Sequence, residues 1–321
     1  MLLTTTVGSF PKPGYLAKAR NLLDSGKFSE YELGQLEKKA TEKCIRLQEE
    51  IGLDILVTSE MERGDMVTHF AENMDGFGIS GPVRSYGNRY YRKPVVKGTV
   101  KRGQPITVDM FEYAQSLTDK PVKAMVTGPY TICDWSFNQY YPNRKELIMA
   151  LAKEIHDEVL DLEKAGAEYI QIDEPAISSR PDEIELAIDA MKIVTEGIKA
   201  KTICHICYGD FAAIYPRILD LAVDQLDLEF ANSGFANLEI FKNTEFTKEI
   251  AVGVLDVHSR IIERKDEIKE NIRKALEVFP VERVYIGPDC GLKTRTPDEA
   301  EAKLRVMVDA VKQIKEELGV E

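Results

Sequence analysis

The feature that most constrains the fold is an alternation of short β-type runs with longer helical patterns along 321 residues. Strands that alternate with helices favour βαβ units and a parallel sheet. Eight such runs fit a closed (β/α)8 barrel, the TIM barrel, and predict one domain over residues 1–321. The runs are residues 2–8, 54–59, 122–127, 168–173, 202–207, 225–230, 250–255 and 283–287.

The helical patterns between these runs carry recognisable ends and apolar stripes. One stripe stops at Gly52, a residue type that often ends helices, and it places Cys44 in the core. Its members are Leu33, Leu36, Ala40, Cys44, Leu47 and Ile51. Thr296, Pro297 and Glu299 combine an N-cap, a first-turn proline and a capping-box acid, so they predict the start of the last helix.

One connection is longer than a barrel needs. Residues 61–121 separate the second and third runs, and they contain probable hairpin strands at 95–100 and 105–108. Loops of this length in a compact domain are usually functional. We therefore expect a long insertion after the second strand that forms part of the active-site wall.

Charge and cysteine content exclude several classes of protein. A net charge of −12 and a pI near 5.1 argue against nucleic-acid or anionic-membrane binding, which needs a basic surface. No apolar run approaches the length of a membrane span. Five scattered cysteines do not resemble a disulfide framework, and the first residues do not resemble a secretory signal. These observations predict a soluble protein of a reducing, cytoplasmic compartment.

Side chains capable of chemistry gather where the predicted strands end. In TIM barrels the catalytic groups lie at the C-terminal ends of the strands. Most of the predicted ends carry at least one titratable group. These groups are Glu60, Asp173, Glu174, His205, Cys207, Asp227, Glu229, Asp256, His258, Asp289 and Cys290.

Four of these groups make a candidate metal-ligand set. His205 and Cys207 lie two residues apart, so they share one strand face, while Cys204 points to the other face. Glu229 and Cys290 follow two other strands, and the resulting N, S, O, S donors suit four-coordinate Zn²⁺. Alternatively, His205 and Cys207 are core residues, and the other two merely line a polar mouth.

A sulfur-rich ligand set also restricts the reaction. Two thiolates and a carboxylate overcompensate the charge of a zinc ion, which makes it a poor Lewis acid for water or a carbonyl. Such a zinc still lowers the pKa of an incoming thiol and holds it as a thiolate. Thiol alkylation is therefore the reaction that this set favours.

The motifs together resemble the catalytic barrel of the cobalamin-independent methionine synthases. The matching segments run in the same order over essentially the whole chain. They are residues 5–11, 59–66, 85–89, 127–137, 172–176, 205–208, 256–259 and 288–295. The resemblance implies a (β/α)8 barrel whose zinc, bound by the four candidate ligands, activates the thiol of L-homocysteine for conversion to L-methionine.

The resemblance also implies how homocysteine is held. Gly8 and Ser9 would hold the amino-acid carboxylate, and Glu60 and Asp173 would hold the ammonium group. Two carboxylates at the barrel mouth suit a small cation on physical grounds as well. The alternative for this pair is an ion pair with Arg63 or another local base.

Three further residues are assigned to the donor side. His258 resembles the family's proton donor to the leaving group, a task that an imidazole suits near neutral pH. Trp135 resembles the residue that packs against the flat ring system of the donor, and Arg89 belongs to the same side. By themselves, His258 could equally cap a loop and Trp135 could be a core residue.

Departures from the family pattern concern the methyl donor. The N-terminal barrel of the long-form enzymes is absent, residues 178–180 read Ser-Ser-Arg where family members place an acid, and Tyr90 replaces a small residue. Short members resemble enzymes that take methyl from a corrinoid. We therefore expect methylcobalamin or a corrinoid protein as donor and partner, ahead of methyltetrahydrofolate.

Two other functions stay open at this stage. The same fold and metal could alkylate another thiol, such as coenzyme M, although a sulfonate acceptor calls for a cation where Glu60 and Asp173 stand. Alternatively, the chain could be a non-catalytic subunit that binds a thiol or zinc. Competition between thiols and turnover by the isolated protein distinguish these possibilities.

Overall fold

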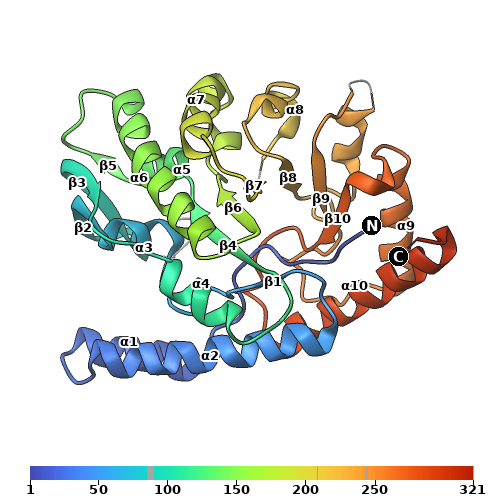
Figure 1. Ribbon diagram of the computed structural model, residues 1–321, viewed down its shortest axis with the longest axis horizontal. Coiled ribbons are helices and arrows are strands. Elements are labelled where there is room, and N and C mark those ends of the chain that lie inside the picture. Colours follow the sequence, from blue (N-terminus) through green and yellow to red (C-terminus); the bar gives the residue numbers. More distant parts are fainter. Residues whose placement is uncertain (85–89, 208, 243–244, 321) are drawn as a thin grey trace. The chain divides into compact units, whose positions relative to one another are not determined.

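The computed structural model describes residues 1–84, 90–207, 209–242 and 245–320, without the side chains of Asp24, Arg84, Tyr90 and Tyr91 (Figure 1). Its helices are α1 (Gly14–Asp24), α2 (Glu30–Ile51), α3 (Met66–Glu72), α4 (Val108–Gln115), α5 (Pro129–Asp134), α6 (Arg144–Lys164), α7 (Ile184–Val194), α8 (Phe211–Ile214), α9 (Lys265–Leu276) and α10 (Pro297–Leu318). Its strands are β1 (Leu56–Val57), β2 (Met74–Arg84), β3 (Tyr90–Arg102), β4 (Val122–Thr127), β5 (Phe137–Asn138), β6 (Tyr169–Asp173), β7 (Lys201–Ile206), β8 (Gln225–Leu228), β9 (Glu249–Gly253) and β10 (Val284–Gly287). Short 3-10 helices include η1 (Ile177–Ser179) and η2 (Pro181–Glu183).

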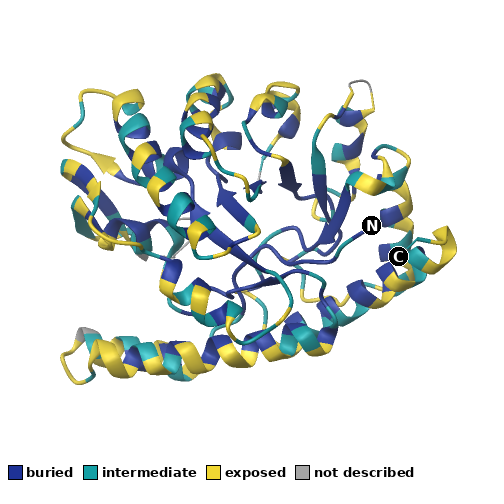
Figure 2. Cartoon of the chain, in the orientation of Figure 1, coloured by how far each residue is buried: buried dark blue, intermediate teal, exposed yellow. Residues whose placement is uncertain are grey.

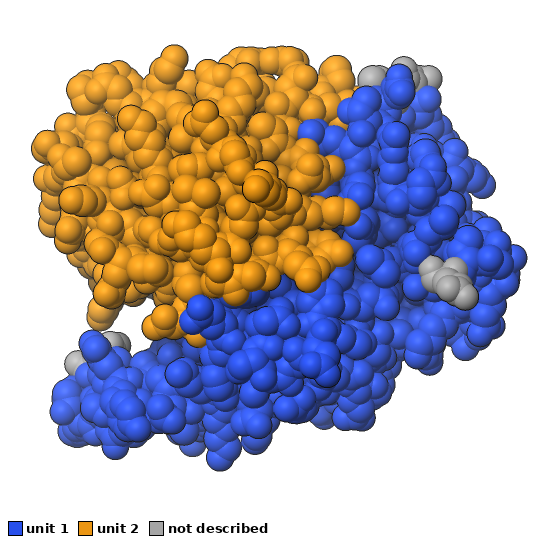
Figure 3. Space-filling model, viewed as in Figure 1, with its two compact units in different colours: residues 1–62, 110–123, 225–321 blue, residues 63–109, 124–224 orange. Residues whose placement is uncertain are grey.

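The chain folds into two compact units (Figure 3). Unit 1 comprises residues 1–62, 110–123 and 225–321, and unit 2 comprises residues 63–109 and 124–224. Both units are discontinuous in sequence, which is why no linker marks a boundary. The expectation of a single domain over residues 1–321 stays a prediction.

Unit 1 contains a run of parallel strands that includes the N-terminal segment. β9 pairs in parallel with both β8 and β10. Thr4 forms a parallel bridge with Ile286 of β10, and its carbonyl accepts a hydrogen bond from the Ile55 amide at 3.0 Å. β1 then pairs in parallel with the first residues of β4, Leu56 opposite Val122. The segment around Thr4 thus fills the place of a strand between β10 and β1.

Unit 2 contains three parallel strands in the order β4, β6 and β7. Thr127 at the end of β4 lies opposite Asp173, and Asp173 lies opposite His205 of β7. All but the first residues of β6 and β7 are buried, because helices cover such parallel strands. The register places the last residues of three strands side by side.

The parallel strands and their helices confirm the predicted (β/α)8 class. Each of the eight predicted runs coincides with a parallel strand or, at Thr4, with a parallel bridge. Figure 2 shows buried strands and helices that bury one face and expose the other. No helix in the described residues is long and apolar enough to cross a membrane.

The segment from 61 to 121 folds differently from the prediction in one respect. β3 confirms the strand expected at 95–100, but its antiparallel partner is β2, and β3 also pairs in parallel with β5. The strand expected at 105–108 is wrong. The amides of Ile106 and Thr107 donate to the buried carboxylate of Glu158 at distances of 2.7 to 3.1 Å, so they are unavailable for a strand ladder.

The predicted helix ends are confirmed. Gly52 ends α2 with a left-handed backbone (φ 90°), a conformation that glycine adopts without a steric cost. Thr296 caps α10, and its hydroxyl accepts from the Glu299 amide while Glu299 bonds back to Thr296. Cys44 is buried on α2, as the apolar stripe predicts.

Candidate metal and substrate site

β7 presents two of the candidate metal ligands. His205 is the next-to-last residue of the strand and Cys207 follows its end, so the alternation of side chains places both on one face. Both side chains are buried, with exposed fractions of 2% and 3%. Cys204 is fully buried on the same strand and does not belong to the metal-ligand group.

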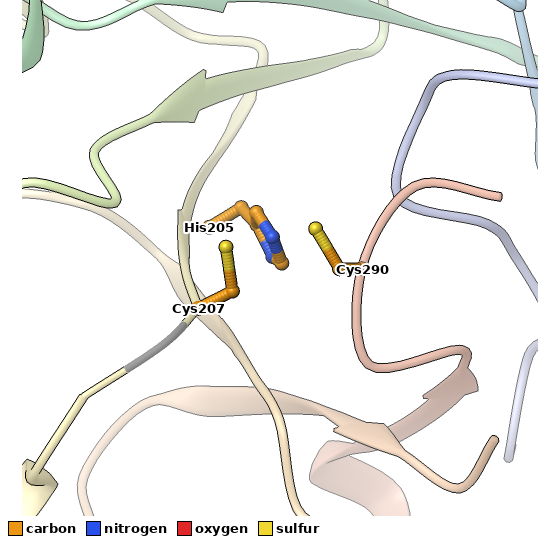
Figure 4. Close-up of side chains that lie close together, drawn as sticks. All are labelled: His205, Cys207 and Cys290. Atoms are coloured by element: carbon orange, nitrogen blue, oxygen red, sulfur yellow. The ribbon is translucent and has the colours of Figure 1, made fainter. Parts of the chain in front are cut away.

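Cys290 completes a group of three candidate ligands. The ligand atoms of His205, Cys207 and Cys290 all lie within 4.8 Å of one another (Figure 4). Donor atoms on one tetrahedral zinc ion lie about 3.5 Å apart, given metal–ligand bonds of about 2.0 to 2.3 Å, so small rotamer changes suffice. One imidazole and two thiols are a donor set that fits a soft or borderline divalent metal. Glu229 is not within this group in the described residues, and its role as fourth ligand stays a prediction.

Asp289, which precedes Cys290, fixes the end of β10 in unit 1. Its carboxylate is fully buried and accepts three backbone amides after β8: Phe230 at 2.9 Å, Ala231 at 3.0 Å and Asn232 at 2.6 Å. Burial raises the pKa of Asp289 to about 8, although the three amides act in the opposite direction. Because Glu229 precedes this loop, Asp289 positions both Glu229 and Cys290.

Gly253 makes room for this carboxylate. A Cβ at Gly253, the last residue of β9, would lie 2.2 Å from Asp289 Oδ1 and 2.8 Å from its Cα. Such distances are well inside van der Waals contact, so the strand must carry glycine here. The absence of a side chain lets Asp289 reach past β9 to the loop after β8.

Unit 2 contains a second buried carboxylate of this kind, Glu174. Its oxygens accept the Tyr130 amide at 3.0 Å, and the Thr131 amide and hydroxyl, both at 2.7 Å. Burial raises the pKa of Glu174 to about 7, against the effect of these hydrogen bonds. Its own amide donates to the His205 carbonyl at 2.9 Å, so Glu174 joins the ends of β6 and β7 to the first turn of α5.

Asp173, a predicted substrate residue, lies directly before Glu174 at the end of β6. Its side chain is 5% exposed, and Oδ1 accepts from Gln171 Nε2 at 2.6 Å. Gln171 is itself fully buried two residues earlier on the same strand face. The Asp173 carboxylate is therefore held at the strand end by its neighbour.

Glu60, the other predicted ammonium-binding residue, lies in unit 1 and has an unusual backbone conformation. Ser59 and Glu60 have φ values of 73° and 56°, in the left-handed region that non-glycine residues seldom occupy. The Ser59 carbonyl accepts the Phe10 amide at 3.2 Å. Strained residues of this kind persist where surrounding structure fixes them, and they concentrate at functional sites.

The predicted carboxylate-binding loop, Gly8 and Ser9, contacts the loop that carries Cys290. The Leu292 amide donates to the Ser9 carbonyl at 2.7 Å. A Cβ at Gly291 would lie 2.1 Å from Ser9 Oγ, so the two loops approach closely. Both belong to unit 1, and this contact brings one predicted substrate residue beside one predicted metal ligand.

The loop that carries His258 is anchored by a buried lysine. His258 is exposed, and its amide donates to Asp256 Oδ1 at 2.8 Å. Lys303 of α10 is fully buried and donates to the carbonyls of Asp256 at 3.1 Å and Ile261 at 2.6 Å. It also bonds both carboxylate oxygens of Glu263 at 2.8 Å, and Glu263 accepts the Asp256 amide at 3.0 Å.

The donor-side predictions have different outcomes. Trp135 follows α5 and is partly exposed, in contrast to the alternative of a core tryptophan. Arg89 lies outside the described residues. Ser178 is buried against Gly209, where a Cβ on the glycine would lie 2.3 Å from Ser178 Oγ.

Sequence reasoning assigned no role to Asp289, Glu174 or Lys303. The first two adjoin predicted site residues, and an acid at a strand end was the available signal. Lys303 had no such signal, because it occupies an apolar face of a helix 40 residues downstream of the loop that it anchors.

The chain is a protein of the (β/α)8 class, and residues at the ends of its parallel strands form a His and Cys group that could hold a metal ion. Residues 2–313 match the family model described as cobalamin-independent synthase, catalytic domain. The chain therefore belongs to the cobalamin-independent methionine synthase family, and it is a methyltransferase.

Named relatives agree with this assignment. The chain is 40% identical over 320 residues to a methionine synthase of Saccharolobus solfataricus, in a match that covers 99% of this chain and 96% of that one. A methionine synthase of Sulfolobus acidocaldarius is 39% identical over 99% of this chain and 94% of its own. A solved B12-independent methionine synthase from Shewanella sp. W3-18-1, in complex with selenomethionine, matches with a TM-score of 0.89, 28% identity and 99% coverage of both chains.

These findings overturn one prediction about the donor. The expectation of a methyl-corrinoid donor, with a corrinoid protein as partner, is wrong because the matched family is cobalamin-independent. The expectation rested on departures from the family pattern, among them those at residues 90 and 178–180. Those features concern how a donor is held and do not identify its chemistry.

Proposed function

We propose that this protein transfers a methyl group to the thiol of L-homocysteine and releases L-methionine, using zinc. The observation that carries the proposal is the group of one imidazole and two thiols whose ligand atoms lie within 4.8 Å. The membership in a methionine synthase family supplies the reaction type. Of the donors considered from the sequence, methyltetrahydrofolate is the one compatible with a cobalamin-independent family.

His205, Cys207 and Cys290 would hold the zinc ion, with Glu229 as the fourth protein ligand. Bound zinc would lower the pKa of the substrate thiol and keep it as a thiolate near neutral pH. The negative ligands would preserve the nucleophilicity of the thiolate. Asp289 supports the set through the loop after β8.

The amino-acid part of homocysteine would bind through charge and backbone groups. Glu60 and Asp173 would pair with the ammonium group, and the loop of Gly8 and Ser9 would receive the carboxylate. The left-handed backbone of Glu60 and the bond from Gln171 to Asp173 support this role, because both fix a carboxylate in one orientation. A sulfonate such as that of coenzyme M would meet two anions here, which disfavours that acceptor.

Methyl transfer would form a bond between the homocysteine sulfur and the methyl carbon. The bond between that carbon and the donor nitrogen breaks, and its electron pair stays on the nitrogen. His258 would deliver a proton to the same nitrogen, which makes it a better leaving group. Trp135, which is partly exposed after α5, and Arg89 would lie on the donor side.

A donor comparison on zinc-loaded protein tests the proposal. We expect about one zinc per chain and methionine formation from homocysteine with methyltetrahydrofolate, while methylcobalamin and coenzyme M support none. Methionine by mass spectrometry and zinc by atomic absorption are the measurements. Zinc-loaded protein that forms no methionine from methyltetrahydrofolate would refute the proposal.

A pair of cysteine variants provides the control for the metal. Cys290→Ser should lower the zinc content to well below one per chain and reduce turnover by at least about a hundredfold. Cys204→Ser changes a buried cysteine that lies outside the ligand group, so it should retain zinc. Equal zinc content in both variants would show that Cys290 is not a ligand.

A further inference from the structure

Unit 1 contains an apolar cavity that has no part in the roles assigned so far. The cavity measures about 140 Å³ and lies between the N-terminal segment, α2 and the first turn of α10. The two helices contact each other along the lower edge of Figure 1. Much of the wall is formed by Phe10, Ala40, Cys44, Met61 and Ala300. Benzene fills an apolar cavity of about 150 Å³, so this cavity has room for a chain of about five or six carbons.

The wall of this cavity offers no charge and little polar surface. The five side chains named above are all buried. Burial raises the pKa of the Cys44 thiol to about 12, although hydrogen bonds with Ser59 and Gln48 act in the opposite direction. Cys44 is therefore a neutral thiol at neutral pH and adds no charge to the wall. Such a wall favours a hydrocarbon chain and disfavours a polar group that would leave its hydrogen bonds in water.

Lys43 provides a cation at the rim of the cavity. Ala40, Lys43, Cys44 and Leu47 are three or four residues apart, so they share one face of α2. Of the described residues that line the cavity, Lys43 alone is charged, and it is exposed. No carboxylate in the described part of the chain forms an ion pair with it. Its ammonium group therefore lies where the cavity meets solvent, with its hydrogen-bond donors available to an anion.

Two residues of the wall directly adjoin the predicted homocysteine residues. Phe10 follows Ser9, and Met61 follows Glu60. The Phe10 amide also donates to the Ser59 carbonyl at 3.2 Å, which joins the two segments. A molecule in the cavity would therefore contact the segment expected to hold the homocysteine carboxylate and the segment expected to hold its ammonium group.

We infer that this cavity, the Lys43 cavity, binds a short aliphatic carboxylate and that the bound acid strengthens the binding of homocysteine. The hydrocarbon chain would lie against the buried wall, and the carboxylate would pair with the Lys43 ammonium group. The site itself stands on the cavity and its charge, whereas the effect on homocysteine rests on the proposed function. Packing against Phe10 and Met61 restricts both segments, so less ordering remains when homocysteine binds.

Binding of three small molecules to the zinc-loaded protein tests the site. Hexanoate carries both the chain and the charge, hexanamide carries the chain alone, and acetate carries the charge alone. Hexanoate should bind with a Kd on the order of 1 mM, as expected for the burial of a few methylene groups. Hexanamide should bind about fivefold more weakly, and acetate should show no binding. Saturation-transfer NMR measures all three.

Substitutions in α2 locate the bound acid. Ala40→Leu adds three carbon atoms to the wall, so it should weaken hexanoate binding at least about tenfold. Lys43→Met should weaken it about fivefold and abolish the preference for hexanoate over hexanamide. Because Lys43 is exposed, this variant provides the test even if Ala40→Leu does not fold. Lys39→Met is the matched control, since Lys39 is an exposed lysine of the same helix that does not line the cavity, and it should keep the wild-type affinities.

The effect on homocysteine is measured by binding alone, without a methyl donor. Saturating homocysteine should lower the Kd of hexanoate about threefold, and saturating hexanoate should lower the Kd of homocysteine by the same factor, because such coupling is reciprocal. Lys43→Met should retain the affinity of wild-type protein for homocysteine when hexanoate is absent.

The outcomes separate this inference from the proposed function. Displacement of hexanoate by homocysteine would place the acid in the substrate site and overturn the inference, as would a Lys43→Met protein that still prefers hexanoate to hexanamide. A Kd for hexanoate that homocysteine leaves unchanged would overturn the coupling. Protein that forms no methionine refutes the proposed function, while the affinities for hexanoate and hexanamide still decide whether the Lys43 cavity is a binding site.

Discussion

Glu174 in unit 2 and Asp289 in unit 1 are buried acids that each hold together two segments of the chain, but they do so through different hydrogen-bond partners. Each is a buried acid directly next to a predicted site residue, each accepts backbone amides from a segment that follows another strand, and each lies against a glycine. Glu174 bonds the first turn of a helix and a hydroxyl, whereas Asp289 bonds three amides of a loop. The side chain next to Glu174 is expected to bind substrate, and the one next to Asp289 to bind metal.

This difference determines which side chains can replace each acid without the loss of a hydrogen bond. Two of the three partners of Glu174 are amides that can only donate, but the third, the Thr131 hydroxyl, can accept as well as donate and so can bond to a changed side chain. The three amides around Asp289 can only donate, so they require a carboxylate or lose a bond. The metal side of the site should therefore tolerate less change than the substrate side.

The largest expected effect comes from filling the space beside each acid. Gly253→Ala puts a methyl group 2.8 Å from the Asp289 Cα, which is backbone and cannot yield cheaply, so we expect a loss of about 3 kcal/mol of unfolding free energy. Gly128→Ala meets the Glu174 side chain at 2.2 Å, and we expect about 2 kcal/mol. Urea unfolding of both variants measures the difference.

Gly34→Ala is the control for these substitutions. Gly34 lies within α2 with nothing within 4 Å of an added Cβ, so alanine should stabilise the protein by roughly 0.5 to 1 kcal/mol. A Gly253→Ala protein as stable as wild type would show that Asp289 is not held against β9.

A smaller effect is expected from neutralising each acid in turn. Asp289→Asn leaves at least one amide facing an NH2 group, so it should cost about 2 kcal/mol and weaken zinc binding about tenfold. Glu174→Gln also leaves one backbone amide facing an NH2 group, but this NH2 group can donate to the Thr131 hydroxyl, so a smaller loss of about 1 kcal/mol is expected. Unfolding curves and competition with a zinc chelator are the measurements. Equal losses of zinc affinity would contradict the contrast between the two acids.

The smallest effect concerns a third buried acid, Glu37, which is held by a cation instead of amides. Arg20 Nη2 lies 3.0 Å from Glu37, yet burial raises the pKa of Glu37 to about 6. The folded state therefore binds the proton of the Glu37 carboxyl more tightly than the unfolded state does. Proton binding at Glu37 thus stabilises the fold fully below about pH 4.5, and this stabilisation is lost as the pH rises through 6. Between about pH 5 and pH 6, the free energy of unfolding of the wild type should fall by about 1 kcal/mol relative to that of Glu37→Gln.

Parallel urea titrations of wild type and Glu37→Gln at several pH values measure this difference. Glu32 is the control position, since its exposed side chain caps α2 and hydrogen bonds from Ser29 lower its pKa. Substitution of Glu32 should leave the change in unfolding free energy between pH 5 and pH 6 the same as in the wild type. A wild-type protein that gains stability over this interval relative to Glu37→Gln would refute the raised pKa.

Much of the fold was predictable because it depends on local patterns. The eight β-type runs, the helix end at Gly52 and the capping box at Thr296 each follow from a few neighbouring residues. β2 was missed because Gly76, Gly78, Gly81 and Pro82 interrupt its sequence, and its strand depends on pairing with β3. The division into two discontinuous units could not be predicted from the sequence either, since it depends on packing between segments that are distant in sequence.

The candidate metal ligands were predictable for a different reason. His205 and Cys207 share a strand face, and the position of Cys290 after a strand end is enough to bring it to the same group. The supporting residues were not predictable, because the bonds of Asp289 and Glu174 connect segments about 60 and 45 residues apart. Sequence spacing identifies which atoms can react, whereas the bonds that orient them arise only in the folded chain.

Lys303 has a consequence for the order in which the protein matures. The loop with His258 emerges from synthesis about 40 residues before the helix that anchors it, so until α10 docks, the carbonyls of Asp256 and Ile261 have no ammonium group to bind. A nascent chain can therefore assemble its strands before the loop with His258, the proposed proton donor, is ordered. The proposed methyl transfer, if it uses His258, would begin only after α10 has docked.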